Sequence, residues 1–221
     1  MTNDSFDSIK EKYYDQAQVK TGVLAGVVKV LNEFVRKYDN AEKIRVEEHK
    51  NLIQNYQPNT ALFEQKNMEI FNTFNDTVAS IKDESRQKVK DTIQQVKDKV
   101  AEIISSNLPE GALSDITLIR SFAGTLSDAE AEIFLGKYEQ SYLASKAIFE
   151  ALTEEQRNRL GVKFISADNV IGSLDSIEET ALKMINNYNG VFNNDVAVLL
   201  YGEWIQTVND AFEKFVSAYG E

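Results

Sequence analysis

Apolar residues recur along this chain mostly at spacings of three and four, as in amphipathic helices, and strand-like alternation is almost absent. Pro58 and Pro109 are the only prolines, and the 50 residues between them contain no glycine. Because proline and glycine are the strongest helix breakers, their absence predicts one long helix over residues 59–107. At ~1.5 Å per residue this helix is roughly 75 Å long, so other helices, other subunits or a lipid surface must cover its apolar side.

The segment before the first proline, about residues 5–55, also has helical spacing. Apolar residues seven or fourteen positions apart mark its buried side: Leu24, Leu31, Tyr38 and Leu52. We expect a helix with a break near Gly22, near Gly26 or at residues 38–40.

A turn at residues 57–59 is expected to bring these two helical segments together. Asn59 or Thr60 is the predicted N-cap of the long helix. Residues 1–107 would then form a helical hairpin.

The apolar rhythm of the long helix is interrupted near its middle, where valines recur eleven residues apart at Val78, Val89 and Val100. An insertion of this kind locally unwinds a left-handed supercoil. We therefore expect a nearly straight helix that packs laterally, rather than a long two-stranded coiled coil.

Shorter helices with conventional caps are predicted after residue 111, two of them opened by capping boxes at Ser127 and Thr153. Their expected ranges are 127–152, 153–161, 176–189 and 194–219. Only Val162–Ile165 has strand-like composition, and four residues cannot form a sheet. Most of the aromatic residues, including Trp204, lie in this part and would fill its core.

Charge is divided unevenly along the chain. Residues 1–107 carry 16 Lys and Arg against 17 Asp and Glu, whereas residues 108–221 carry 8 against 18. This shift coincides with the breakers of residues 107–111 and predicts a domain boundary there. The acidic C-terminal half should repel nucleic acid and anionic lipid, so we expect no nucleic-acid partner.

The chain lacks the residues that most enzymes and metal sites use. It has no cysteine, and its single histidine, His49, has Val46 where a Glu-x-x-His metal motif needs a glutamate. Carboxylate pairs such as Glu154 and Glu155 lie at predicted helix starts, where the helix dipole stabilises them. Phosphate-loop, dinucleotide-binding and nucleophile-elbow motifs are missing. We expect no enzymatic activity, no catalytic residue, no cofactor and no metal.

The long helix is patterned around its axis over residues 76–104. At about 100° per residue its apolar positions fall in one arc, with bases on both flanks and acids opposite. This arc is the candidate partner interface, and it consists of Val78, Ile81, Val89, Ile93, Val96 and Val100, flanked by Lys82, Arg86, Lys90 and Lys97. Flanking bases suit an acidic partner helix, and they also suit a lipid surface. We favour a partner helix and expect the hairpin to self-associate through this arc.

A second, aromatic stripe runs through Phe134, Tyr138, Tyr142 and Phe149 at near-helical spacing. Core packing is the favoured interpretation of these side chains, and a ligand or partner contact is the alternative.

The same stripe lies within a stretch, residues 125–149, that resembles a segment of helical virion-assembly proteins from bacteriophages and prophages of Gram-positive hosts. The matching positions are Lys137, Tyr138, Tyr142, Leu143, Ala144 and Ala147. In these relatives a Lys-Tyr and a Tyr-Leu-Ala element follow a long charged helical region. Ser141 and Ser145 depart from the basic or Asn residues that the relatives usually carry around the second tyrosine. The resemblance implies a small virion-assembly or virion-associated protein rather than an enzyme.

These observations predict an all-α protein with a helical hairpin over residues 1–107, a linker at 108–111 and a compact acidic helical domain over 112–221 that folds alone. The favoured function is that of a phage scaffolding or virion-associated structural protein, which binds itself and other structural proteins such as capsid components. The alternative is a lipid-surface or membrane-active protein, with residues 23–35 inserting beside the arc. The polar, acidic start of the chain predicts no signal peptide, so we expect it in the host cytoplasm or on the virion.

Overall fold

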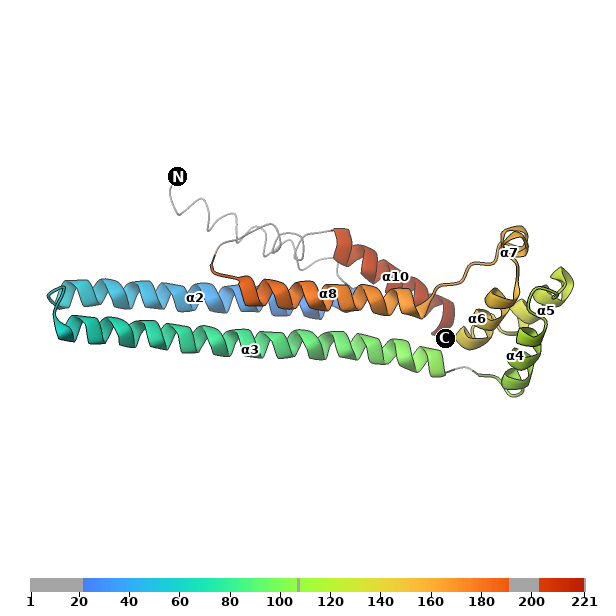
Figure 1. Cartoon of the computed structure of the whole chain (residues 1–221), viewed down its shortest axis with the longest axis horizontal. Coiled ribbons are helices and arrows are strands. Elements are labelled where there is room, and N and C mark those ends of the chain that lie inside the picture. Colours follow the sequence, from blue (N-terminus) through green and yellow to red (C-terminus); the bar gives the residue numbers. More distant parts are fainter. Residues whose placement is uncertain (1–21, 107, 191–202, 221) are drawn as a thin grey trace. The chain divides into compact units, whose positions relative to one another are not determined.

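The computed structural model describes residues 22–106, 108–190 and 203–220, and every regular element in these ranges is a helix (Figure 1). The predicted all-α class is therefore confirmed. The helices form two compact units. Of the described residues, unit 1 comprises 22–93, 176–190 and 203–206, and unit 2 comprises 94–106, 108–175 and 207–220.

The two units do not follow the division that charge and breakers suggest. The expected linker at 108–111 lies inside unit 2, and three helices contribute to both units: α3 (Ala61–Ser105), α8 (Ala167–Asn187) and α10 (Glu203–Tyr219). The physical reason is packing, because the second half of α8 belongs with the hairpin although it follows the linker in sequence. Independent folding of residues 112–221 stays a prediction.

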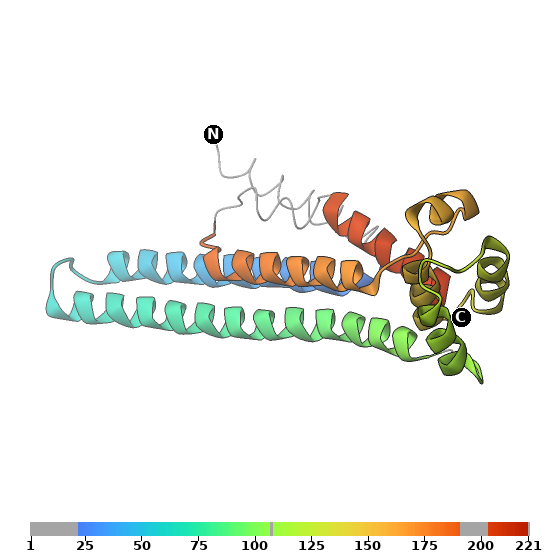
Figure 2. The same cartoon turned by 45° about the vertical axis from the view of Figure 1, so that its right-hand side comes forward.

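Unit 1 is built on a helical hairpin of α2 (Ala25–Asn55) and the first part of α3, in accordance with the sequence (Figures 1 and 2). Thr60 caps α3, because its hydroxyl oxygen accepts a hydrogen bond of 3.2 Å from the backbone N–H of Phe63.

The structure describes the first segment from Gly22 onward. A short 3-10 turn, η1 (Gly22–Leu24), precedes α2, and the expected residues before Gly22 lie outside the described ranges. The helix α2 continues without interruption through Gly26 and residues 38–40, so a break at those positions was a wrong expectation. The buried side chains on both sides of these positions stabilise the continuous helix.

In unit 1, the second half of α8 lies beside the hairpin (Figures 1 and 2). These three helices supply most of the buried apolar side chains of the unit, among them Val27, Val28, Leu31, Phe34 and Val35 of α2, Val89 and Ile93 of α3, and Ile177, Ala181 and Ile185 of α8. Tyr188, just after α8, makes edge contacts with Phe34 and Tyr38, with ring centroids 5.5 and 4.9 Å apart. These aromatic contacts close the end of the three-helix core.

Unit 2 contains α4 (Ala112–Ser121), α5 (Asp128–Lys137), α6 (Tyr142–Ala151) and α7 (Glu154–Leu160), together with the last part of α3, the first part of α8 and most of α10. One buried cluster joins α4, α5 and α6, and its largest members are Ile116, Ile119, Tyr138 and Ile148. A second cluster is aromatic and joins α6 to the end of α10, through Tyr142, Phe164, Phe215 and Tyr219.

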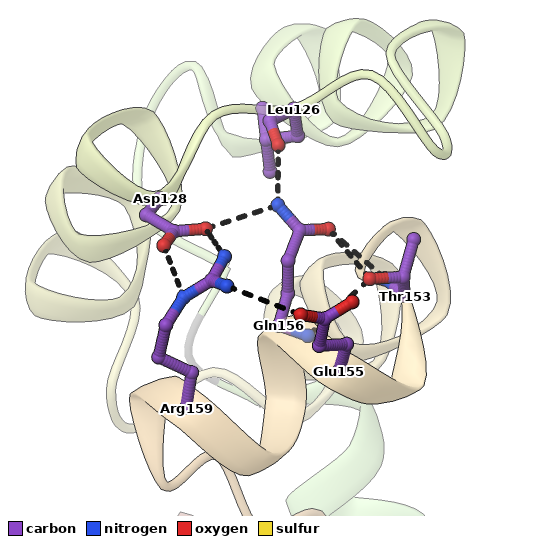
Figure 3. Close-up of polar contacts among 6 residues, drawn as sticks. All are labelled: Leu126, Asp128, Thr153, Glu155, Gln156 and Arg159. Carbon is purple, nitrogen blue, oxygen red and sulfur yellow. Dashed lines mark hydrogen bonds and ion pairs between the residues drawn. The ribbon is translucent and has the colours of Figure 1, made fainter.

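Both predicted capping boxes form. The Ser127 hydroxyl accepts from the Glu130 N–H at 3.3 Å, and the Glu130 carboxylate accepts from the Ser127 N–H at 2.9 Å. Thr153 and Gln156 make the same reciprocal pair at the start of α7 (Figure 3). Gly161 ends α7 in the left-handed conformation, with φ of 65°, as expected for a C-terminal glycine.

Two helix boundaries differ from the sequence expectation. The helix predicted over 127–152 is broken at residues 138–141, because Tyr138 and Tyr142 enter different clusters and would share one face of a continuous helix. The helix predicted to begin at Ser176 begins at Ala167 instead. Its extra turns bury Ala167, Val170 and Leu174, and the N–H of Ala167 donates to the Tyr142 hydroxyl at 3.2 Å.

Candidate interaction surface

The predicted apolar arc of α3 is largely part of the core of the chain. Val89, Ile93, Val96 and Val100 are buried, whereas Val78 and Ile81 are half-buried. The assignment of these four buried residues to a free partner or lipid surface is therefore wrong. The physical reason is that other helices of the same chain already cover this side of α3.

The bases that flank the arc are used within the chain as well. Lys82 Nζ donates to the backbone carbonyl of Asn186 at 2.8 Å, and Arg86 donates to the Asn186 side chain at 2.6 Å. Positive charge at the C-terminal end of α8 complements the helix dipole. Burial lowers the pKa of Lys82, and the nearby Arg86 charge lowers it further.

The two other bases of this flank differ from each other. Lys97 forms an ion pair of 2.6 Å with Asp175 of α8. Lys90 is exposed. Lys82, Arg86 and Lys97 thus contact α8 of the same chain rather than a helix of another chain.

Near the turn of the hairpin, large apolar side chains are exposed on both helices, whereas those of the arc are mostly buried. On α2 the exposed fractions are 51% for Ile44, 52% for Val46 and 52% for Ile53. On α3 they are 51% for Leu62, 64% for Met68 and 41% for Phe71. Two helices bury only the seam between them, and α8 ends at Asn187 before it reaches this region (Figures 1 and 2).

Four of these side chains lie on the same side of the hairpin as α8, but closer to the turn, beyond the end of α8. On α2, Val46 and Ile53 follow Asp39 at spacings of seven, and Asp39 accepts a hydrogen bond of 3.1 Å from the Tyr188 hydroxyl. On α3, Met68 and Phe71 precede Lys82 and Arg86 on the side that contacts Asn186. We name this surface the distal face and define it as Val46, Ile53, Met68 and Phe71.

A polar seam lies beneath the distal face. Arg45 places its guanidinium carbon 5.3 Å from the ring centre of Phe71 and 5.4 Å from that of Phe74, which is within cation–π range. Its partner is Glu42, at 2.8 Å, and this hydrogen bond lowers the pKa of the Glu42 carboxyl.

The only histidine belongs to the same seam. His49 Nδ1 and Asn67 Oδ1 lie 3.0 Å apart across the two helices. A polar pair at such a position fixes the register of packed helices. This pairing is a structural role for His49, and the described residues contain no group of three or more His, Cys, Asp or Glu side chains that could hold a metal.

The aromatic stripe of the sequence is divided between the two clusters of unit 2. Tyr138 and Tyr142 are buried, as core packing requires, whereas Phe134 and Phe149 are half-buried. Phe149 lies beside Phe164 and under the Arg157 guanidinium, which is 4.4 Å from its ring centre. The four residues therefore do not form one face.

Within residues 125–149, Lys137 and Tyr138 share an acidic partner on α4. Lys137 Nζ donates to Asp115 at 2.6 Å, and the Tyr138 hydroxyl donates to the same carboxylate oxygen. These hydrogen bonds, with that of Lys137 the stronger, hold the pKa of Asp115 below its usual range. The contacts tie α5 to α4 and give both residues a structural role.

Comparison of the chain with models of protein families, with curated proteins and with solved structures finds no match. No helix in the described ranges is long and apolar enough to cross a membrane.

Sequence reasoning missed the distal face as a surface. The available signal was that Val46 and Ile53 lie off the heptad positions of Tyr38 and Leu52. Apolar residues off the buried stripe are the ones that a two-helix hairpin leaves exposed.

Proposed function

We propose that this chain is a non-enzymatic structural protein of bacteriophage assembly, a scaffolding or virion-associated protein. It acts through helix-mediated self-association and through binding of other structural proteins such as capsid components. The observation that carries the proposal is the cluster of exposed large apolar side chains on both helices near the turn of the hairpin. Apolar patches of this kind mark protein-binding surfaces.

Two further features support this proposal. The stretch from residue 125 to 149 resembles a segment of phage virion-assembly proteins. The buried residues and hydrogen bonds of unit 2 account for its conspicuous side chains as structural ones, including Tyr138, Tyr142 and Lys137. Binding through surfaces, rather than chemistry at a cleft, is the function that such an arrangement favours.

The alternative function, binding to a lipid surface, is less well supported. It relied on the arc of α3, and the buried members of that arc are already covered by the chain itself. A lipid role would have to use other residues.

Self-association is tested by sedimentation velocity of the full chain over a range of concentrations. We expect the weight-average mass to rise with concentration above that of the 25.0 kDa monomer. A monomer at every concentration would contradict the proposal.

The assembly role is tested in phage-producing cells that express the chain. Density-gradient fractions are probed with an antibody against it, and we expect the chain in fractions that contain immature or mature particles. Flotation with anionic vesicles is the control for lipid binding. Recovery with vesicles and not with particles would replace the proposal by the lipid alternative.

A further inference from the structure

The distal face is the continuation of a surface that another helix already occupies. Asp39 of α2 and Lys82 and Arg86 of α3 hold the end of α8 by hydrogen bonds. Beyond that end the same sides of α2 and α3 present the distal face, with exposed fractions between 41 and 64%. This side of the hairpin thus forms a helix-binding surface along its length. The helix α8 covers one part of this surface, and the distal face is the part that remains exposed.

The opposite side of the hairpin near the turn is more polar. It carries Glu48 and Thr73, and Lys66 and Glu69, which form an ion pair of 2.8 Å. Its exposed apolar residues, Ile44 and Leu62, stand among these polar side chains. The distal face is therefore the better apolar surface of the two.

The charges beside the distal face differ between the two helices. On α2 the exposed Lys43 and Lys50 lie one heptad apart next to Val46. Glu47 lies between them but about 40° farther round the helix. On α3 the charged residue next to Met68 on this side is Glu64. One rim is thus basic and the other carries an acid.

This difference selects an orientation for a second copy. If the two-fold axis were perpendicular to the helices and in the plane of the contact, α2 of one copy would lie on α2 of the other. Lys43 and Lys50 of one copy would then lie opposite the same lysines of the other copy and repel them. A two-fold axis parallel to the helices places α2 of each copy on α3 of its partner. Lys50 then lies near the level of Glu64 on α3 of the other copy, since residues 49 and 67 lie at the same level of the hairpin, and the contact is complementary in charge there.

We infer that the distal face binds a second copy of this chain, in a parallel, two-fold arrangement in which α2 of each hairpin lies on α3 of the other. The inference rests on the self-association proposed above and names its surface. Each copy buries Val46, Ile53, Met68 and Phe71 in the contact, and Lys43 and Lys50 set its orientation.

The test compares two double variants of the full chain by sedimentation velocity. Ile53→Glu with Met68→Glu changes the distal face. Ile44→Glu with Leu62→Glu is the matched control, because it changes exposed apolar residues of the same two helices on the opposite side. All four positions are exposed, so circular dichroism should show an unchanged helix content.

We expect the first variant to raise the dissociation constant of the dimer at least about tenfold, since central apolar residues dominate such contacts. The control should stay within about twofold of the wild type. Equal effects of both variants, or a larger effect of the control, would overturn the inference. A wild-type chain that is monomeric would instead contradict the proposed self-association itself.

A charge exchange distinguishes a second copy from other occupants. Lys43→Glu with Lys50→Glu should weaken the dimer, and the addition of Glu64→Lys should restore part of the affinity. If the occupant were an anionic membrane, Glu64→Lys would strengthen vesicle binding and leave the mass unchanged. If another segment of the same chain occupied the face, the variants would change hydrogen exchange at residues 46–71 without changing the mass. Either of these last two results would overturn the inference.

Discussion

Single side chains decide how closely the helices of the hairpin approach. Gly26 lies opposite Thr92, and a Cβ at position 26 would lie only 2.9 Å from the Thr92 methyl carbon. The absence of a side chain at Gly26 therefore allows close packing of α2 on α3, at the cost of some helix propensity.

Gly26→Ala should destabilise the chain by about 1 kcal/mol, because overpacking by ~1–3 kcal/mol outweighs a propensity gain of about 1 kcal/mol. Adding Thr92→Ser removes the opposing methyl group and keeps a hydroxyl that can donate to the Lys88 carbonyl, now at 2.7 Å. The double variant should recover the wild-type free energy of unfolding, measured by urea denaturation. Gly172→Ala, in a helix with open space around it, is the control and should stabilise the chain.

Glu84 of α3 is bound by two lysines, one on each helix of the hairpin. It accepts hydrogen bonds from Lys37 and Lys88, both at 2.7 Å, and the hydrogen bond from Lys37 is the largest cause that lowers its pKa to about 2. Because the folded value lies below the ordinary 4.5, the ionised form stabilises the fold. This stabilisation is complete above about pH 4.5 and is lost as the pH falls toward about 2.

Glu84→Gln should therefore lower the melting temperature at neutral pH, and this effect should disappear as the pH falls below about 2. The carboxyl carbon of Glu84, followed by NMR, should titrate near pH 2 at low salt, and high salt should move its pKa upward because the contacts are exposed. A midpoint near 4.5 at low salt would contradict the proposed hydrogen bonds.

At the scale of helices, caps also serve as connections between elements. The Gln156 amide completes the capping box of α7 and donates to the Leu126 carbonyl at 2.7 Å and to Asp128 at 3.1 Å (Figure 3). Arg159 donates to the same Asp128 carboxylate at 2.7 Å. Gln156, which the capping-box pattern places at the third position of α7, thus also binds the start of α5.

Gln156→Glu separates these two roles. A glutamate keeps the capping box, but it cannot donate to Leu126, and it places a negative charge beside Asp128. We expect a loss of about 1–3 kcal/mol in the free energy of unfolding, measured by thermal and urea denaturation at pH 7. Glu130→Gln, which keeps an acceptor for the Ser127 N–H, is the control and should change stability by less than about 0.5 kcal/mol. Equal effects of the two variants would show that the contact between α7 and α5 is unimportant.

At the scale of the whole molecule, the helices that contribute to both units decide whether one part of the chain can fold without the other. The second half of α8 has its buried residues Ile177, Ala181 and Ile185 in unit 1, with α2 and α3. A fragment of residues 112–221 retains the buried cluster of α4, α5 and α6 but loses these partners.

This fragment provides a direct test of the domain division. We expect it to keep protected amides in residues 112–152, to exchange rapidly in residues 176–187 and to bind a hydrophobic dye, because the apolar side of α8 is uncovered. Slow exchange throughout 112–221 and a single cooperative transition would instead support the division at residues 108–111.

Local chemistry in the sequence determined the class of the fold and many of its boundaries. The proline-free and glycine-free stretch forms one helix, and the boxes at Ser127 and Thr153 form as predicted, because each depends on hydrogen bonds within a few residues. The buried stripe of α3 could also be recognised from the sequence, since the spacing of its apolar residues is a property of a single helix.

Tertiary structure alone decided what covers each surface. Three features are consequences of burial between residues far apart in sequence: α8 begins at Ala167, Tyr138 and Tyr142 enter different clusters, and the second half of α8 lies in the unit that holds Val89 and Ile93 of the arc. A periodic pattern shows which side of a helix is apolar, but it is the same pattern whether that side meets its own chain or a partner. The exposed distal face therefore became recognisable only once the end of α8 was in place beside Asp39 and Lys82.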